Sequence, residues 1–264
     1  MTRSVISYSM LIQTIKPTPV LNTPDFSFAF GGKTGNQIPA TEKGHPYHYE
    51  FVALKGTRFQ VEEILSEICF RVSCSFYPGE LFIDRRFTKP AKKSSSPLLP
   101  PLNVILKRMK KLLGIPYVWG GNWSTGIPET LSFYPPKAPL DPRTEIIWTF
   151  RGLDCSGLLF EAARGATPRN TSQLLNFGKA LKISNLTSNQ MASIVLPLDM
   201  IIYPGHVLFV LDSCTTIESK SPFGVTCGNL KCRLEEILSE KKPVDDLPEN
   251  ANASNFFQIR RFII

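Results

Sequence analysis

The first third of the chain alternates apolar and polar residues in short runs. The runs stand at 49–53, 57–61, 69–76 and 80–84, and turns such as Lys55-Gly56 and Pro78-Gly79 separate them. Alternation with a period of two is typical of strands that bury one face. The pattern therefore predicts a small all-β, barrel-like domain over residues 1–90.

The pattern changes at a segment rich in proline, serine and lysine over residues 91–101. Such a composition cannot form a packed element, so we predict a linker there. Beyond it, apolar residues recur at steps of three and four from Leu102 to Leu113, as on one face of an amphipathic helix. Pro101 suits the start of this helix and Gly114 its end.

The remaining pattern predicts one α+β domain over residues 102–264, with helices packed on an antiparallel sheet. A second helix is expected over 154–165, because Asp154 suits an N-cap and Gly165 a C-terminal stop. A hairpin is predicted from 200–203 and 206–212 around Pro204-Gly205, with further strands at 215–219, 224–227 and 256–262. The stretch 123–148, rich in proline and polar residues, predicts a long loop.

Composition and charge are those of an ordinary globular protein. Apolar residues make up 42% and charged residues 20% of the chain, without the run of about 18 uncharged apolar residues that a membrane helix needs. Residues 1–15 lack the small-residue cleavage site of a signal peptide, so we expect a cytoplasmic location. The formal charge is +8, but no nucleic-acid-binding motif accompanies it. We expect neither a nucleic-acid partner nor stable membrane insertion, and the oligomeric state stays open.

The cysteine pattern argues against metal or redox chemistry. Six cysteines stand at 69, 74, 155, 214, 227 and 232, too widely spaced for a C-x-x-C pair. The three histidines do not complete a zinc site with them. We therefore expect no metal and no cofactor, and mostly structural or neutral thiols.

Cys155 differs from the other cysteines because it lies at the predicted start of a helix. Unpaired N–H groups and the helix dipole favour a thiolate there and can stabilise an oxyanion. The base must be His206, the one histidine that follows it in the chain. Glu218, in the next predicted strand, can orient the imidazole. At this point the alternatives are an inert buried cysteine, a surface histidine beside a turn and a solvated glutamate.

Four stretches in order resemble the NlpC-type bacterial cell-wall cysteine peptidases, a papain-like group. They are Gly114-Ile-Pro-Tyr-Val-Trp-Gly-Gly, Asp154-Cys-Ser-Gly-Leu, Pro168-Arg-Asn-Thr-Ser-Gln, and Leu198-Asp-Met-Ile-Ile with Gly205-His-Val. The resemblance covers about 103–226. Upstream, residues 80–87 resemble the last strand of the bacterial Src-homology-type barrels that often precede this catalytic domain.

The resemblance implies a papain-like fold with Cys155 as nucleophile and His206 as base. It implies hydrolysis of the γ-D-glutamyl–diamino-acid bond in peptidoglycan stem peptides or muropeptides, the expected partners. By position Tyr117 lines the groove, and Asp154 can pair with a substrate amine.

The resemblance also places Ser156 and Arg169 in substrate-side segments, although Arg169 can equally buttress the fold. The chain departs from the pattern in two ways. Residues 122–153 intervene before the nucleophile motif, and Glu218 stands where the family usually has His, Asn or Gln.

Three functions from different classes remain open at this stage. The first is the cysteine endopeptidase. The second is a papain-like acyltransferase or amidase acting on a lipid or another amide, which product analysis with muropeptides separates from the first. The third is a non-catalytic wall-binding protein, which the presence of both Cys155 and His206 argues against.

Overall fold

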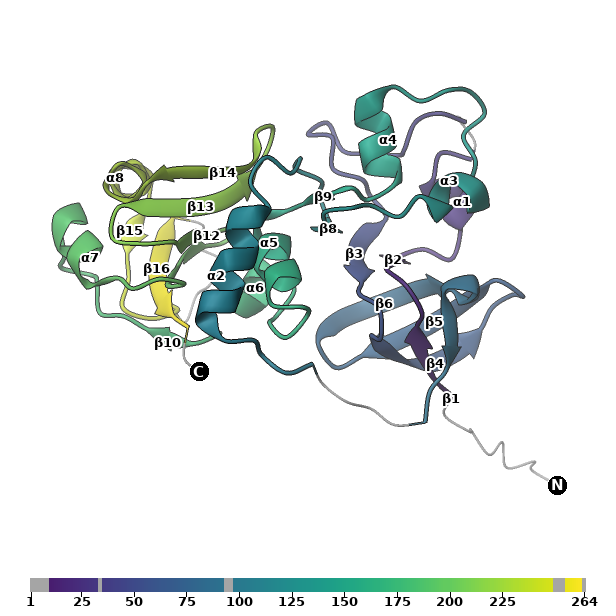
Figure 1. The fold of residues 1–264 in the computed structure, drawn as a ribbon, viewed down its shortest axis with the longest axis horizontal. Coiled ribbons are helices and arrows are strands. Elements are labelled where there is room, and N and C mark those ends of the chain that lie inside the picture. Colours follow the sequence, from purple (N-terminus) through teal and green to yellow (C-terminus); the bar gives the residue numbers. More distant parts are fainter. Residues whose placement is uncertain (1–9, 33–34, 93–96, 249–254, 263–264) are drawn as a thin grey trace. The chain divides into compact units, whose positions relative to one another are not determined.

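The computed structural model describes residues 10–32, 35–92, 97–248 and 255–262. The chain divides into two compact units (Figure 1). Unit 1 comprises Met1–Ser96 and Ile127–Thr149, and unit 2 comprises Pro97–Gly126 and Phe150–Ile264. Of the predicted linker 91–101, residues 93–96 lie outside the described residues. The segment 127–149, which the sequence placed inside the 102–264 domain, thus belongs to unit 1.

Unit 1 is built on an antiparallel sheet with the strand order β3-β2-β6-β5-β4-β1-β7. Its strands are β1 (Met10–Thr14), β2 (Thr18–Leu21), β3 (Tyr49–Ala53), β4 (Arg58–Ile64), β5 (Cys69–Cys74), β6 (Tyr77–Asp84) and β7 (Thr88–Pro90). The alternating residues of these strands, such as Phe51, Phe59 and Leu81, form one buried cluster. The short helices α1 (Phe26–Ala29) and η1 (Arg85–Phe87) flank the sheet strands in the chain.

The inserted segment is helical, so the predicted long loop is wrong. It contains α3 (Glu129–Phe133) and α4 (Pro142–Trp148), and the Asp141 carboxylate caps α4 by accepting from two backbone N–H groups of its first turn. Trp148 is fully buried and donates from Nε1 to the Tyr134 carbonyl at 3.0 Å. The Tyr134 ring stacks on Phe30 of unit 1 at 4.6 Å between centroids. Aromatic burial therefore fixes the segment in unit 1.

Unit 2 carries the second sheet, with the order β10-β16-β11-β12-β13-β14 and β15 paired to β16. The strands are β8 (Asn122–Trp123), β9 (Gly152–Leu153), β10 (Lys179–Ala180), β11 (Met200–Tyr203), β12 (His206–Val210), β13 (Thr215–Lys220), β14 (Gly224–Asn229), β15 (Lys242–Pro243) and β16 (Phe256–Arg261). The helices are α2 (Leu102–Lys111), α5 (Cys155–Ala162), α6 (Thr171–Leu174), α7 (Ser188–Ile194) and α8 (Leu230–Glu240). The α+β class with antiparallel sheets is thus confirmed, and only the short β15 pairing is parallel among the described strands.

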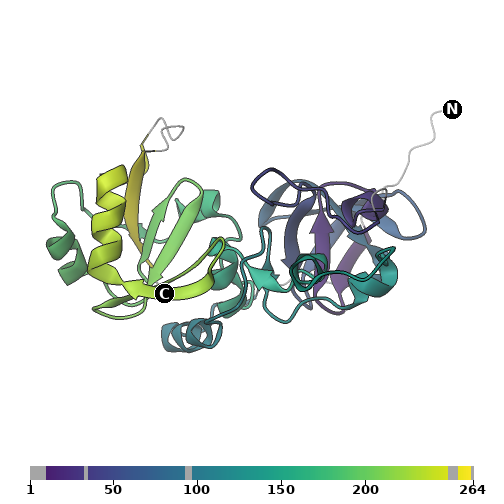
Figure 2. The same ribbon diagram turned by 90° about the horizontal axis from the view of Figure 1, so that it is seen from above.

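The central strands of the unit 2 sheet are buried on both faces, since residues 200–202 of β11 and 207–210 of β12 are consecutive apolar residues and all are buried. Met200, Ile202 and Phe209 pack with α2 and α5 in one cluster, whereas Ile201 and Leu208 pack with α7 and α8 in another. In Figure 1 the central strands lie between these two helix groups, and Figure 2 shows α8 against the sheet from above. Within the described ranges, none of the helices is long and apolar enough to cross a membrane.

Candidate active site

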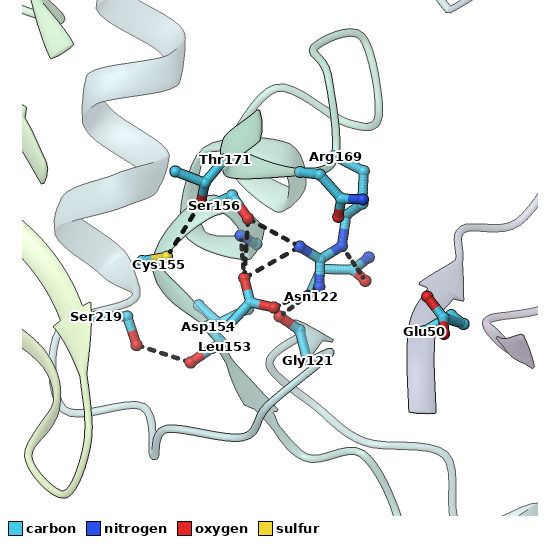
Figure 3. A network of polar contacts seen from close by, with 12 residues as sticks. Glu50, Gly121, Asn122, Leu153, Asp154, Cys155, Ser156, Arg169, Thr171 and Ser219 are labelled. Atoms are coloured by element: carbon cyan, nitrogen blue, oxygen red, sulfur yellow. Dashed lines mark hydrogen bonds and ion pairs between the residues drawn. The ribbon is translucent and has the colours of Figure 1, made fainter. Parts of the chain in front are cut away.

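The candidate nucleophile is the first residue of α5, as the sequence predicts. Asp154 is the N-cap and its carboxylate accepts from the Gly157 N–H at 2.7 Å, which fixes where the helix begins. Cys155 is 7% exposed, and its Sγ lies 3.5 Å from the Thr171 hydroxyl (Figure 3). The same sulfur lies 3.9 Å from the Gly205 carbonyl oxygen. The remaining first-turn N–H groups of α5 give this end of the helix a positive electrostatic character.

His206 and Glu218 meet as the strand pairing predicts. The β12–β13 register aligns Phe209 with Ile217, so the carboxylate-bearing residue is a diagonal neighbour of His206 on the same face. His206 Nε2 lies 2.8 Å from Glu218 Oε2. Because this contact occupies Nε2, the other ring nitrogen, Nδ1, is left for the Cys155 thiol.

The ionisation of the pair favours a charged imidazole. Burial lowers the pKa of His206, but hydrogen bonds with Cys155 and Glu218 outweigh it and raise this pKa to about 9. Burial raises the pKa of Glu218. The hydrogen bond from His206, together with the nearby positive charges of Arg233 and Lys220, outweighs this effect and lowers the Glu218 pKa. An imidazolium beside the Glu218 carboxylate is therefore the favoured state of His206 near neutral pH.

Asp154, Ser156 and Arg169 bind mainly one another (Figure 3). Arg169 Nη2 donates to Asp154 Oδ2 at 2.6 Å, and its Nη1 donates to Asp154 Oδ1 and to the Ser156 hydroxyl at 3.0 Å each. Arg169 Nε donates to the Asn122 side-chain oxygen at 3.1 Å. The side chains of Arg169 and Asp154 are 1% and 11% exposed. A substrate amine would have to share Asp154 with this buried guanidinium.

Tyr117 lies beside the nucleophile segment, since it forms an isolated bridge with Leu153. Burial raises the pKa of Tyr117 well above its usual value, and the nearby charges of Asp154 and Cys155 add to this. Its hydroxyl is therefore neutral and able to donate a hydrogen bond at any pH where the pair is active.

Sequence reasoning missed three residues that the structure brings to this region. Thr171 begins α6 and faces the thiol. Ser219 donates to the Leu153 carbonyl at 2.7 Å, which ties β13 to β9 just before the nucleophile. Arg233 of α8 contacts Glu218. Strand alternation could have placed Ser219 on the sheet face that Glu218 does not occupy. Thr171 lies in the stretch Pro168-Arg-Asn-Thr-Ser-Gln, which could have drawn attention to it, whereas no local pattern marks Arg233.

Neither a disulfide nor a metal cluster involves the candidate nucleophile. All six cysteines, which lie within the described ranges, are free thiols. In the same ranges no group of three or more His, Cys, Asp or Glu side chains is arranged to hold a metal ion.

Comparison with known proteins gives distant structural likenesses. No protein-family model and no curated protein sequence matches the chain. An NlpC/P60 family protein from Bacillus cereus is 15% identical, with 97% of this chain and 64% of that chain covered and a TM-score of 0.36. RipB, a peptidoglycan hydrolase from Mycobacterium tuberculosis, is 19% identical, with 62% and 65% covered and a TM-score of 0.36.

RipD from the same organism, described as a non-catalytic NlpC/p60 domain protein adapted to peptidoglycan binding, is 17% identical. The comparison covers 61% of this chain and 97% of that chain, with a TM-score of 0.37. The chain thus spans a little under two thirds of the length of the B. cereus protein and of RipB. At TM-scores this low the likenesses carry no argument about function, which rests on the residues and their geometry.

Proposed function

We propose that the chain is a cysteine hydrolase that cleaves amide bonds by acyl transfer. The observation that carries this proposal is the arrangement of Cys155 at the start of α5 with His206, whose Nε2 meets Glu218 at 2.8 Å. A thiol at a helix N-terminus, a hydrogen-bonded imidazole and a carboxylate that orients it are the parts that thiol acyl transfer requires.

The chemistry follows from these positions. The Cys155 thiolate attacks the carbonyl carbon, and first-turn N–H groups of α5 stabilise the resulting oxyanion. The C–N bond then breaks as the His206 imidazolium protonates the leaving amine, which leaves a thioester on Cys155. His206, now neutral, takes a proton from water and the water oxygen attacks the thioester. The C–S bond then breaks, which releases the acid and restores the Cys155 thiolate and the His206 imidazolium.

The substrate class in this proposal is the peptidoglycan stem peptide, with cleavage of the γ-D-glutamyl–diamino-acid bond. The support is the ordered set of four sequence motifs that resemble the NlpC-type cell-wall peptidases. Tyr117 beside the nucleophile segment fits the same assignment as a neutral hydrogen-bond donor to the substrate. A cytoplasmic enzyme that trims released wall fragments is the corresponding cellular role.

The test is incubation of the purified protein with defined stem peptides, followed by mass spectrometry. We expect cleavage to create one new amine terminus on the diamino acid. The variant Cys155→Ser should give no product, although its circular dichroism spectrum should be that of the unchanged protein. A second substrate pair, with a free or an acetylated N-terminus, reports whether released fragments are preferred. Equal product from Cys155→Ser, or binding of wall peptides without cleavage by the unchanged protein, would reject the hydrolase and leave an acyl transfer to another acceptor or a binding role.

A further inference from the structure

The carboxylate of Glu218 is held by more than the imidazole. Arg233 Nη2 donates to Glu218 Oε2 at 3.1 Å, and Arg233 Nε lies 2.8 Å from Oε1. The Nε contact is an ion pair rather than a hydrogen bond, because the Nε–H does not point at an acceptor. Lys220 Nζ lies 3.7 Å from Oε1. Both oxygens of the orienting carboxylate are therefore fixed by cations.

Two features hold the Arg233 side chain beside Glu218, namely its burial and a second ion pair. Its side chain is 12% exposed, and it forms a second ion pair with Glu236 one turn further along α8. Glu218 is 4% exposed at the side chain. One hydrogen bond and one close ion pair from the same guanidinium restrict how the Glu218 carboxylate can turn, because the guanidinium is planar and rigid.

Glu218 lies on the α8 face of the sheet, opposite to the face where α5 packs. Leu208, its cross-strand neighbour in the extended register, packs in the cluster with α7 and α8, whereas Ile217 packs in the cluster with α5. A hollow of about 260 Å³ opens on the α8 face beside His206 and Glu218. Its charged or titratable lining residues are Tyr203, His206, Glu218, Lys220, Arg233, Glu236, Glu240 and Lys241. From the α5 side, the titratable group that interacts with His206 is Cys155.

We propose that Arg233 is a positioning residue of this site. Its fork holds the Glu218 carboxylate so that Oε2 meets His206 Nε2, and its charge limits how strongly Glu218 draws a proton onto the imidazole. The proposal rests on the proposed cysteine-hydrolase function, and it adds a residue that acts through Glu218 without touching the substrate.

Two substitutions separate the two parts of this role. Arg233→Met removes fork and charge, so the Glu218 charge acts unopposed on His206. We expect kcat/KM to fall about tenfold or more, in line with loss of a charge-assisted hydrogen bond, and the alkaline limb of its pH profile to rise by about one unit. Arg233→Lys keeps the charge but not the fork. We expect its rate to fall similarly while its alkaline limb stays near that of the unchanged protein.

The rate of Cys155 alkylation by iodoacetamide, measured against pH, supplies a readout that needs no substrate. Its upper inflection reports the His206 proton, so it should rise in Arg233→Met and stay in Arg233→Lys. If the unchanged protein cleaves no wall peptide, the proposed function fails, but the alkylation profiles still decide the role of Arg233. The matched control is Lys231→Met on the same helix, whose ion pair with Glu235 is long, at 3.9 Å, and half-exposed.

Chemical rescue gives a third measurement. The hollow is large enough for a small guanidinium, so ethylguanidinium at millimolar concentration should restore part of the rate and return the inflection in Arg233→Ala, whereas sodium chloride of equal ionic strength should not. Should Arg233→Met fail to fold, Arg233→Lys and this rescue carry the test. An alkylation inflection that is the same in all variants, or a loss of rate shared by Lys231→Met, would overturn the proposal.

Discussion

Replacing Arg169 by methionine tests whether this residue supports the nucleophile helix or contacts the substrate. Methionine keeps most of the side-chain volume but removes the guanidinium that pairs with Asp154. The Asp154 carboxylate is then left buried without its cation, and breaking a buried pair in this way costs about 3–5 kcal/mol of unfolding free energy.

The structure places the expected loss near the lower end of this range. Asp154 keeps two donors after the change, the Gly157 N–H at 2.7 Å and the Ser156 hydroxyl at 3.2 Å. The change also removes the hydrogen bond that Arg169 Nε donates to the Asn122 side chain at 3.1 Å. We therefore expect a loss of about 3 kcal/mol, because the remaining donors partly compensate the orphaned carboxylate.

Urea denaturation followed by circular dichroism measures the loss, and amide hydrogen exchange over α5 assigns it to unit 2. The double variant Asp154→Asn with Arg169→Met should lose less than the sum of the two single changes, by about 2 kcal/mol, since each single change orphans the other partner. Lys231→Met is the control, because an exposed pair contributes about 0–1 kcal/mol.

Two results would refute this reasoning. A loss below about 1 kcal/mol for Arg169→Met, with strictly additive double-variant values, would mean that the pair does not hold the helix start. A normal stability combined with a large rise in KM would instead make Arg169 a substrate contact, which is the role that the sequence motif also allowed.

Three further predictions concern reactivity, pH and the inserted segment. Iodoacetamide at neutral pH should label Cys155 before Cys69, since burial raises the pKa of Cys69 to about 11; peptide mapping that finds Cys69 labelled first would contradict this. The His206 pKa of about 9 lies above its usual value, so the imidazolium is present at neutral pH and activity should fall as pH rises through about 9; Glu218→Gln should move this limb to lower pH, because it removes a charge that raises the pKa, and an unmoved limb in a pH–rate series would contradict the assignment. Trp148→Ala should cost about 3–5 kcal/mol in the unfolding of unit 1, measured by urea denaturation, and a change below 1 kcal/mol would show that the segment packs loosely.

Local patterns predicted the elements that depend on local physics. The steps of three and four that begin at Leu102 gave α2, and the apolar runs around the Pro204-Gly205 turn gave the β11–β12 hairpin. The Asp154 N-cap gave the start of α5. The pairing of His206 with Glu218 followed from antiparallel neighbours, because register alone brings them together.

The rest depended on contacts between distant parts of the chain. The proline and polar residues of the stretch 123–148 suggested a long loop, but Tyr134 and Trp148 are buried and pack on Phe30 of unit 1. Nothing in the local sequence of α8 shows that Arg233 faces a strand 15 residues earlier. The neutralisation of Asp154 by Arg169 likewise requires the tertiary structure, since the motif alone shows an acidic residue without its partner.

The path of the chain through the two units has a consequence for how the protein is made and dissected. Unit 1 takes its last piece, 127–149, from inside the stretch that builds unit 2, and the β8–β9 pair marks where the chain leaves and returns. During synthesis, Tyr134 and Trp148, which contact Phe30, emerge from the ribosome only after the nascent chain has passed α2, the first helix of unit 2. Cutting the chain at the linker would not separate the two units. The N-terminal product would lack residues 127–149 of unit 1, and the C-terminal product would carry them. Excising 127–149 and bridging Gly126 to Phe150 is the cut that the topology favours for unit 2, and supplying 127–149 in trans is its counterpart for unit 1.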